Sequence, residues 1–314
     1  MSDRATLRTI DGQPVLRLER RLRHSPAKVW RAVTDPAELV NWFPAAVETE
    51  LRPGAPMRFT FADVAGDDTW DGEVLEVDEP KVFMFRWSLD VLRFELIPDG
   101  EGCRLVFTQT IGGDWVGRLA AGRSAAGWDT CLGLLTAGLD GRPATAPAHW
   151  LAPMERYVEE FGLAAGTVTR TPEGFELRFA RDLVWKPPAE VWSVLTGDTD
   201  LGERPPPSAT AEHVPAGRLR HAAPPRELTY EWLHDGRPAG TVTWRIVSDE
   251  RLGVRVEVTQ TVPAELAGLR ATALAAWQVR LELFFAACAG DHRPWPADRA
   301  EELVGRYAAQ LGRR

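Results

Sequence analysis

The stretch WDGEVLEVDEPKVFMFRW, residues 70–87, has the pattern of two β-strands joined by a tight turn. In its second half Phe83, Phe85 and Trp87 occupy every other position, and side chains two residues apart share one face of a strand. This face carries more aromatic surface than a solvent-exposed hairpin needs. We therefore expect it to be covered, either as part of a packed core or as the wall of a cavity that holds a ligand.

The chain carries an internal repeat, which indicates two copies of one fold. Four segments of the first half recur in the second half in the same order. The pairs are PAKVW (26–30) with PAEVW (188–192), FTQT (107–110) with VTQT (258–261), WDTCLGLL (128–135) with WQVRLELF (277–284), and RYVEEFG (156–162) with RYAAQLG (306–312). The length of 314 residues also fits two domains of about 150 residues each.

We place the boundary between the copies in GLAAGTVTRTPEG (162–174), a stretch rich in glycine and small polar residues that suits a linker. The predicted domains are 1–164 and 172–314. The second copy is shorter, because GERPPPSATAEHVPAG (202–217) replaces a segment rich in tryptophan and phenylalanine. Consecutive prolines lack the N–H groups of a strand ladder, so we expect the second copy to have lost a strand pair there.

A long amphipathic helix is predicted near the end of each copy. Its apolar side chains recur at i, i+4, i+7 and i+11, which is the spacing of one helix face. They are Trp128, Leu132, Leu135 and Leu139 in the first copy and Trp277, Leu281, Phe284 and Cys288 in the second. The alternating strands present one apolar and one polar face, so this helix is the expected cover of the apolar face. The predicted fold class is α+β.

Composition and charge exclude several classes of partner. The formal net charge of -8 argues against nucleic acids and anionic membranes, which require a basic face. No apolar run reaches the roughly 20 residues of a membrane helix, and the N-terminal MSDRATLRTI lacks the apolar stretch of a signal peptide, so we expect a cytoplasmic protein. Cys103, Cys131 and Cys288 are far apart and flanked by apolar residues, which favours core positions over disulfides. The histidines show no metal-ligand spacing, and we predict no metal and no cofactor.

Four segments of the first copy, taken together and in order, resemble a known family. They are SPAKVWRAVTDPAELVNWF (25–43), GEVLEVDEPKVFMFRW (72–87), GCRLVFTQT (102–110) and GWDTCLGLL (127–135). The set is similar to the bacterial family named for homology to the activator of the heat-shock-protein-90 ATPase, in the START-like (SRPBCC) superfamily. The second copy resembles the same fold more loosely.

The resemblance implies two tandem helix-grip domains, each a curved antiparallel sheet wrapped around a long C-terminal helix, often with an apolar cavity between them. Members of the superfamily bind lipids, polyketides, hormones or drugs in this cavity, and some act as cyclases or resistance proteins. A small hydrophobic ligand is therefore the expected partner.

The inner face of the first copy supplies the candidate ligand contacts. Its polar members, Gln109 and Arg20, recur as Gln260 and Arg181 in the second copy. A buried guanidinium needs a carboxylate, a carbonyl or a ligand anion, so Arg20 either bonds within the protein or orients the polar end of a ligand. For any single apolar member, core packing is the plainer interpretation. The full set is Trp42, Phe43, Phe59, Phe61, Trp70, Phe83, Phe85, Trp87, Leu92, Phe94, Gln109, Trp128 and Arg20.

These observations lead to one preferred function and two alternatives. The preferred function is binding of a small hydrophobic molecule between the sheet and the long helix of the first copy, with the second copy stabilising or regulating the first. The enzymatic alternative is a cyclase- or hydrolase-type activity in the same cavity, in which Arg20, Gln109 or a nearby glutamate polarises a carbonyl. The third is a module that docks a protein partner on the polar sheet faces, as a co-chaperone would. No catalytic residue is assigned, because Ser124 lies in a helical stretch rather than in a nucleophile elbow.

Overall fold

The computed structural model describes residues 4–61, 69–197 and 201–312. The side chains of Thr69 and Trp70 also lie outside the described part of the chain. The ligand contact predicted for Trp70 therefore falls outside the described residues.

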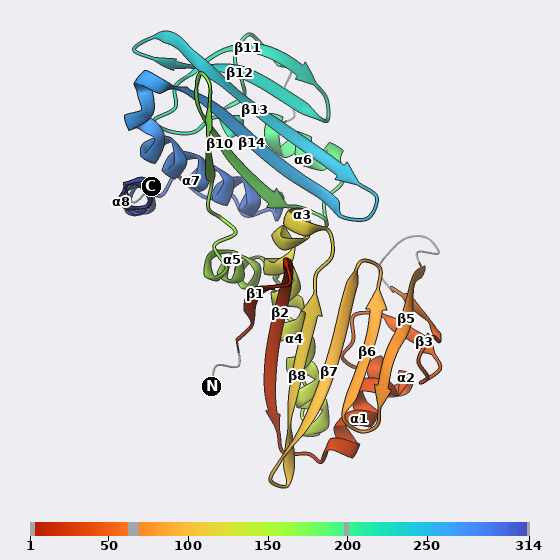
Figure 1. The fold of residues 1–314 in the computed structure, drawn as a ribbon. Coiled ribbons are helices and arrows are strands. Elements are labelled where there is room, and N and C mark those ends of the chain that lie inside the picture. The colour runs from red at the N-terminus through yellow and green to blue at the C-terminus, as the bar shows by residue number, and fades with distance from the viewer. Residues whose placement is uncertain (1–3, 62–68, 198–200, 313–314) are drawn as a thin grey trace. The chain divides into compact units, whose positions relative to one another are not determined.

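Two compact units make up the chain, Met1–Phe161 (unit 1) and Gly162–Arg314 (unit 2). Each unit contains an antiparallel sheet and a long helix that lies along one face of that sheet (Figure 1). The long helix is α4 (Ala121–Leu139) in unit 1 and α7 (Arg270–Cys288) in unit 2. This architecture confirms the predicted α+β class with two tandem helix-grip domains.

The sheet of unit 1 has strand order β1-β2-β8-β7-β6-β5-β4-β3, with antiparallel neighbours throughout. The N-terminal hairpin β1–β2 therefore closes against the last strand, β8. The strands are β1 (Thr6–Ile10), β2 (Gln13–Leu22), β3 (Ala46–Thr49), β4 (Pro56–Thr60), β5 (Thr69–Asp78), β6 (Val82–Trp87), β7 (Asp90–Asp99) and β8 (Gly102–Thr110). The helices besides α4 are α1 (Pro26–Thr34), α2 (Pro36–Leu39), α3 (Asp114–Leu119) and α5 (Leu151–Glu160).

The described sheet of unit 2 has the order β11-β12-β13-β14-β10-β9 and is also antiparallel. The strands are β9 (Thr167–Thr171), β10 (Gly174–Asp182), β11 (Ala216–Ala223), β12 (Glu227–His234), β13 (Arg237–Asp249) and β14 (Gly253–Pro263). The helices besides α7 are α6 (Pro188–Thr196), the 3-10 segments η1 (Pro207–Ala209) and η2 (Ala264–Leu269), and α8 (Ala297–Leu311).

Two edge strands, β1 and β9, have no counterpart among the predicted elements. Each pairs with the following strand to form the N-terminal hairpin of its unit. Strand β9 lies inside the predicted linker 162–174, so that prediction is wrong for residues 167–171. Both strands are largely exposed, and their polar residues hide the alternation by which a half-buried strand is recognised. The domain limits 1–164 and 172–314 stay predictions, and a domain that began at residue 172 would lack β9.

The strand registers show which positions of the two units correspond. Leu92 of β7 faces Gln109 of β8, and Val242 of β13 faces Gln260 of β14. Strands β5 to β8 therefore correspond to β11 to β14, and β3 and β4 have no strand counterpart in the described part of unit 2. The predicted loss of a strand pair from the second copy is confirmed.

The proline-rich segment of unit 2 covers part of the inner sheet face. The carbonyl oxygen of Ala209, at the end of η1, accepts hydrogen bonds from Tyr230 Oη at 2.7 Å and from Trp244 Nε1 at 2.9 Å. All three residues are buried. The segment thus provides the polar partner that these two inner-face side chains need once they are removed from water.

The predicted helix stripes are buried and form the core of each unit with the inner sheet face. Every residue of the two stripes is buried, and so are the three cysteines, which are free. Burial raises the pKa of both Cys131 and Cys288 to about 12, so their thiols stay protonated at neutral pH. The prediction of core cysteines is confirmed.

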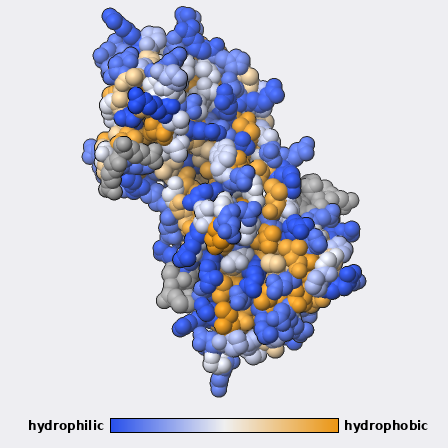
Figure 2. Space-filling model, viewed as in Figure 1, coloured by the Kyte–Doolittle hydropathy of each residue, from blue (hydrophilic) through white to orange (hydrophobic). Residues whose placement is uncertain are grey.

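Hydrophilic side chains cover much of the visible surface of both units, with hydrophobic residues between them (Figure 2). On the sheets, charged residues are paired: Glu19 accepts from Arg104 at 3.3 Å, and Glu257 accepts from Arg178 at 2.8 Å and from Arg255 at 2.7 Å. None of the helices in the described ranges is both long and apolar enough to cross a membrane.

Basic side chains gather at the C-terminal end of α4. Nε2 of His24 lies 2.9 Å from Oδ1 of Asp140, the C-cap residue, and Arg142 donates to the same carboxylate at 3.1 Å. Lys28 Nζ donates to the carbonyl of Leu139 at 2.9 Å. Positive groups are favoured at this end of a helix, where carbonyls lack helical partners. The hydrogen bonds from His24 and Arg142 lower the pKa of Asp140 to about 2.

Acid unfolding tests the contribution of Asp140. Because its pKa is lower in the folded chain than the ordinary value of about 3.9, the stabilisation is present above about pH 4 and is lost as the pH falls toward 2. We expect Asp140→Asn to lower the free energy of unfolding at pH 7 and the gap to wild type to close toward pH 2, measured by urea titration with circular dichroism. Asp99→Asn, on the outer end of β7, serves as the control. A gap for Asp140→Asn that stays constant across this pH range would contradict the assignment.

Candidate functional site

Aromatic rings gather on the inner face of unit 1. Phe43, which follows α2, has its ring centroid 5.5 Å from Trp87, 5.6 Å from Trp128 and 5.6 Å from Trp42. Phe59 of β4 stacks on Trp87 with centroids 4.6 Å apart. Stacked and edge-to-face pairs of this kind add to the free energy gained by burial alone. These rings form one aromatic cluster that joins β4 and β6 to α4.

Most of the predicted ligand contacts lie in this aromatic cluster or directly beside it. The buried members are Trp42, Phe43, Phe59, Phe83, Phe85, Leu92, Phe94, Gln109 and Trp128. Phe61 and Trp87 are partly exposed and stack with centroids 5.8 Å apart, so they form the solvent-facing end of the cluster. Arg20 is held elsewhere, on α4, by contacts described below.

Trp42 and Phe43 have a packing role that the comparison of the repeats does not predict. Trp42 Nε1 donates to the carbonyl of Ala32 at 2.9 Å, and its ring lies edge-on to Phe94 at 6.0 Å. The two rings cover the inner face of unit 1, as η1 does in unit 2. The second copy lacks these two rings because η1 covers its inner sheet face instead.

Each unit joins its long helix to its last strand by the same hydrogen bond. Trp128 Nε1 of α4 donates to Gln109 Oε1 at 3.0 Å, and Trp277 Nε1 of α7 donates to Gln260 Oε1 at 2.6 Å. All four residues are buried. The glutamines that interrupt the apolar faces thus have partners within the protein.

Asp90 completes the polar group of unit 1 and was not among the predicted site residues. Its Oδ2 accepts from Gln109 Nε2 at 2.5 Å, and its Oδ1 accepts from the backbone N–H of Gly112 at 2.9 Å. A Cβ at Gly112 would lie 2.5 Å from the carbonyl of Leu89, so only glycine allows this approach. Burial raises the pKa of Asp90, against the opposing effect of the two hydrogen bonds.

The corresponding position in unit 2 is a glycine. Trp87 faces Asp90 across β6 and β7, and Trp232 faces Gly240 across β12 and β13. A Cβ at Gly240 would lie 2.7 Å from Nε1 of Trp232, so the glycine makes room for this indole. Without the carboxylate, the Nε2 atom of Gln260 is buried and has no hydrogen-bond partner in the described residues. An aspartate in one copy and a glycine in the other is the sequence signal that could have revealed Asp90.

The indole N–H groups of the two equivalent tryptophans, Trp87 and Trp232, also differ in their hydrogen bonding. Trp232 Nε1 donates to the carbonyl of Thr261 at 2.7 Å. Trp87 Nε1 is buried and has no partner among the described residues. A buried donor left unsatisfied costs about 1–3 kcal/mol. Unit 1 therefore holds an unused hydrogen-bond donor at the partly exposed end of its aromatic cluster.

Arg20 has a carboxylate partner in the protein. Its Nη2 donates to Asp129 Oδ1 at 2.5 Å, and its Nη1 donates to the carbonyl of Glu19 at 2.9 Å. The other oxygen of Asp129 accepts from Tyr157 Oη at 2.9 Å, and the Tyr157 oxygen accepts from the N–H of Ala5 at 3.5 Å. Arg20, Asp129 and Tyr157 thus tie β2, α4 and α5 together, and the need for a ligand anion is removed.

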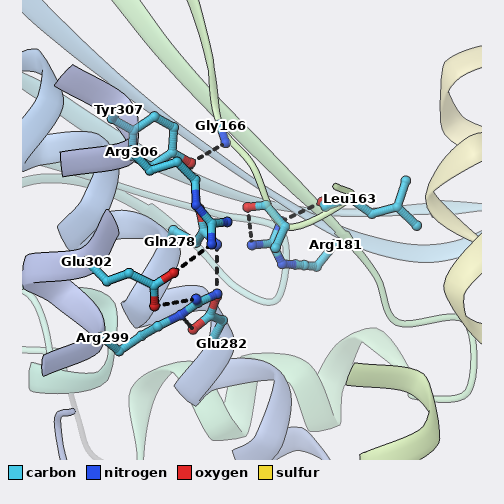
Figure 3. A network of polar contacts seen from close by, with 10 residues as sticks. Leu163, Gly166, Arg181, Gln278, Glu282, Arg299, Glu302, Arg306 and Tyr307 are labelled. Carbon is cyan, nitrogen blue, oxygen red and sulfur yellow. Dashed lines mark hydrogen bonds and ion pairs between the residues drawn. The ribbon is translucent and has the colours of Figure 1, made fainter. Parts of the chain in front are cut away.

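Unit 2 repeats this arrangement with neutral partners (Figure 3). Arg181 donates to the carbonyls of Leu163 at 3.2 Å and Ala164 at 2.7 Å. Tyr307 Oη donates to Gln278 Oε1 at 2.6 Å and accepts from the N–H of Gly166 at 2.9 Å. The recurrence in both units identifies the arginine and tyrosine as structural anchors of the N-terminal hairpin and the last helix.

The described part of the cluster combines aromatic rings with a few polar groups. Among the described residues, no three His, Cys, Asp or Glu side chains are placed to hold a metal ion. The cluster instead offers aromatic faces, the N–H of Trp87 and the carboxylate of Asp90.

Residues 23–140, which lie within unit 1, match the family model described as "Activator of Hsp90 ATPase homolog 1-like protein". No curated protein matches the chain. Similar solved structures include EF2215 from Enterococcus faecalis, a conserved protein of unknown function, with 22% identity over 50% of this chain and 90% of that chain and a TM-score of 0.44. CalU16 from Micromonospora echinospora has 19% identity over 52% and 97%, with a TM-score of 0.41. DynU16, from the dynemicin biosynthetic locus, has 19% identity over 92% and 98%, with a TM-score of 0.39. The family match confirms the resemblance indicated by the motifs of the first copy.

Replacing Arg20 distinguishes a structural from a ligand-binding role. The Arg20 side chain is 12% exposed and that of Asp129 is 29% exposed. Arg20→Met removes the nearer cation of Asp129 and leaves Arg156, 3.4 Å from its Oδ2. We expect the free energy of unfolding to fall by about 1–3 kcal/mol, measured by urea titration. Arg21→Met is the matched control, because the neighbouring Arg21 side chain is 72% exposed. Equal effects of the two substitutions would contradict the structural role of Arg20.

Double-mutant cycles test the tryptophan–glutamine bond in both units. In unit 2 we expect Trp277→Phe to destabilise the protein by about 1–3 kcal/mol, because it leaves Gln260 Oε1 buried and unpaired. Adding Gln260→Leu should recover much of this loss, since it removes both unpaired atoms. In unit 1, adding Gln109→Leu to Trp128→Phe should recover less of the lost stability. The second substitution also removes the amide that donates to Asp90 Oδ2. Thermal unfolding measures all six variants, the two single substitutions and the double substitution of each unit, and strictly additive effects within each pair would rule out the coupling.

Proposed function

We propose that unit 1, in which residues 23–140 match the Activator of Hsp90 ATPase homolog 1-like family, binds a small, mainly apolar molecule at its aromatic cluster. The bound molecule contacts Phe61 and Trp87 at the partly exposed end of the cluster. One of its oxygen or nitrogen atoms accepts a hydrogen bond from Trp87 Nε1.

The buried N–H of Trp87, which has no acceptor among the described residues, carries this proposal. Native proteins pair nearly all buried donors, and an exception at the end of an aromatic surface is best explained by a group that arrives from outside. Trp232 provides the contrast, because this equivalent indole in unit 2 donates to the carbonyl of Thr261. A strand backbone can therefore satisfy a tryptophan at this position, and unit 1 differs in leaving the donor unused.

The surroundings of Trp87 support an apolar ligand with a single polar group. Phe59 and Phe61 stack on the Trp87 ring with centroids at 4.6 and 5.8 Å, so flat apolar surface surrounds the donor. Small-molecule sites combine such walls with a few placed polar groups. Asp90 faces Trp87 in the strand register and holds Gln109 and Gly112 in place, which fixes the polar end of the site.

A catalytic use of the same surface would assign Asp90 as the proton-exchanging group, because burial raises its pKa. Both of its oxygens already accept hydrogen bonds from Gln109 and Gly112, which favours a structural role. Docking of a protein partner on the outer sheet faces has less support, since Glu19 and Glu257 are paired with arginines of their own units. Binding of a small molecule is the function that these contacts favour.

A matched pair of probes tests the role of the Trp87 donor. We expect 1-naphthol, whose oxygen can accept from the indole N–H, to bind about two- to tenfold more tightly than naphthalene, the range expected for one net hydrogen bond. In Trp87→Phe this preference should disappear while naphthalene binding is largely kept. Equilibrium dialysis measures both affinities, and Trp150→Phe, at the exposed N-cap of α5, is the control. Equal affinities for the two probes in the wild-type protein, or failure of both to bind, would refute the proposal.

A further inference from the structure

A cavity lies in unit 2, outside the residues that match the family model. It has a volume of about 430 Å³ and lies between α6, η1, α7 and the segment after α7. This volume is within the usual range for small-molecule sites. Phe284, on its wall, also contacts the buried ring of Trp244 at 5.2 Å, so the cavity reaches the core of the unit.

The wall of this cavity is apolar on one part and cationic on another. Val194, Leu283 and Phe284 are among its apolar residues. Arg280, His292 and Arg293 also line it, and no acidic side chain is among the described lining residues. Arg293 already forms an ion pair with Asp291 at 2.7 Å. Arg280 beside apolar surface, with no carboxylate among the described lining residues, suits an anion that carries an apolar body.

Among the lining residues of this cavity, Arg280 gives the strongest indication of the ligand's chemistry. Its Nε atom is buried and has no hydrogen-bond partner in the described residues, and no described carboxylate forms an ion pair with it. Burial lowers the pKa of Arg280, and the negative charge of Glu212 opposes this effect without a hydrogen bond. Its guanidinium carbon lies 5.6 Å from the centre of the Trp295 ring. By contrast, Arg181 in the same unit is fully engaged with backbone carbonyls.

A guanidinium N–H that is removed from water without an acceptor is costly, as at Arg280 Nε, and the planar N–H groups of the side chain match the two oxygens of a carboxylate. We propose that the cavity between α6 and α7 binds a small organic carboxylate, with the carboxylate on Arg280 and its apolar body against Leu283 and Phe284. This site is independent of the function proposed for unit 1. It makes unit 2 a binding domain in its own right rather than a degenerate partner of unit 1.

Octanoate and octanamide form a matched pair of probes, because they share an apolar chain and differ in the charge of the head group. We expect the full-length protein to bind octanoate and to bind octanamide at least tenfold more weakly, measured by isothermal titration calorimetry. Arg280→Met should weaken octanoate binding about ten- to hundredfold, the loss expected for one or two hydrogen bonds to a charged group. Arg270→Met removes the same charge from the same helix outside the cavity, and it should leave the affinity unchanged.

The Nε–H resonance of Arg280 in the wild-type protein provides a readout that does not depend on the folding of a variant. Arg280→Lys removes this resonance and thereby assigns it, and the signal should shift on addition of octanoate and stay in place with octanamide. Inorganic phosphate forms a further arm: if phosphate alone shifts the signal and octanoate does not, the site is a phosphate site and the carboxylate proposal is wrong. Equal binding of octanoate and octanamide, or unchanged octanoate affinity in Arg280→Met, would also overturn it. Trp87→Phe should bind octanoate as the wild type does, so failure of the unit 1 proposal leaves this one intact.

Discussion

An indole ring carries one N–H group, and a helix that buries a tryptophan against a sheet must find that group an acceptor. In both units the long helix meets this requirement through a glutamine of the last strand, Gln109 for Trp128 and Gln260 for Trp277. The bond is directional, whereas the surrounding apolar contacts are not. It therefore sets the position of the helix along the sheet, and the rest of each inner face is arranged around it.

The two units differ in what surrounds this bond. In unit 1, Asp90 accepts a hydrogen bond from the amide of Gln109, while the indole of Trp87 has no acceptor in the described part of the chain. In unit 2 a glycine replaces the aspartate, the indole of Trp232 is satisfied, and the amide of Gln260 is left over. Among the described residues, each unit thus leaves one buried donor of this group without an acceptor, and in unit 1 this donor belongs to a partly exposed tryptophan. Unit 2 has a further unpaired donor, the Nε–H of Arg280.

In each unit a buried or half-buried arginine and a tyrosine connect the N-terminal hairpin to the helices. Arg20 and Arg181 interrupt the apolar face of the second strand at equivalent positions, and both are engaged within the protein. The tyrosine of the last helix, Tyr157 or Tyr307, links the long helix to the backbone before the first strand. This explains why the RYxxxxG segment recurs in the sequence although it lies outside the sheet. It also shows why a polar residue on an inner face is weak evidence for a ligand when the chain can supply its partner.

The sequence by itself determined the repeat, the α+β class, the inward face of the main strands, the stripe of each long helix and the loss of two strands from the second copy. These features follow from periodicity, from matching segments and from the inability of proline to join a ladder, all of which are local properties of the chain. The edge strands β1 and β9 were missed, because a mostly exposed strand carries no apolar alternation. The aromatic residues of the inner face could also be identified from the sequence, because side chains two residues apart lie on the same face of a strand.

Only the tertiary structure decided which polar atoms are satisfied. Trp87 and Trp232 occupy equivalent positions in the repeat, yet only the indole N–H of Trp232 has an acceptor among the described residues. This depends on the backbone of β14, two strands away from β12, and on whether aspartate or glycine lies opposite. Asp129 became the partner of Arg20, and Arg280 was left without one, through contacts between segments distant in the chain. Hydrogen bonding requires a partner within about 3 Å at a suitable angle, and such proximity is a property of the folded chain that no local pattern contains.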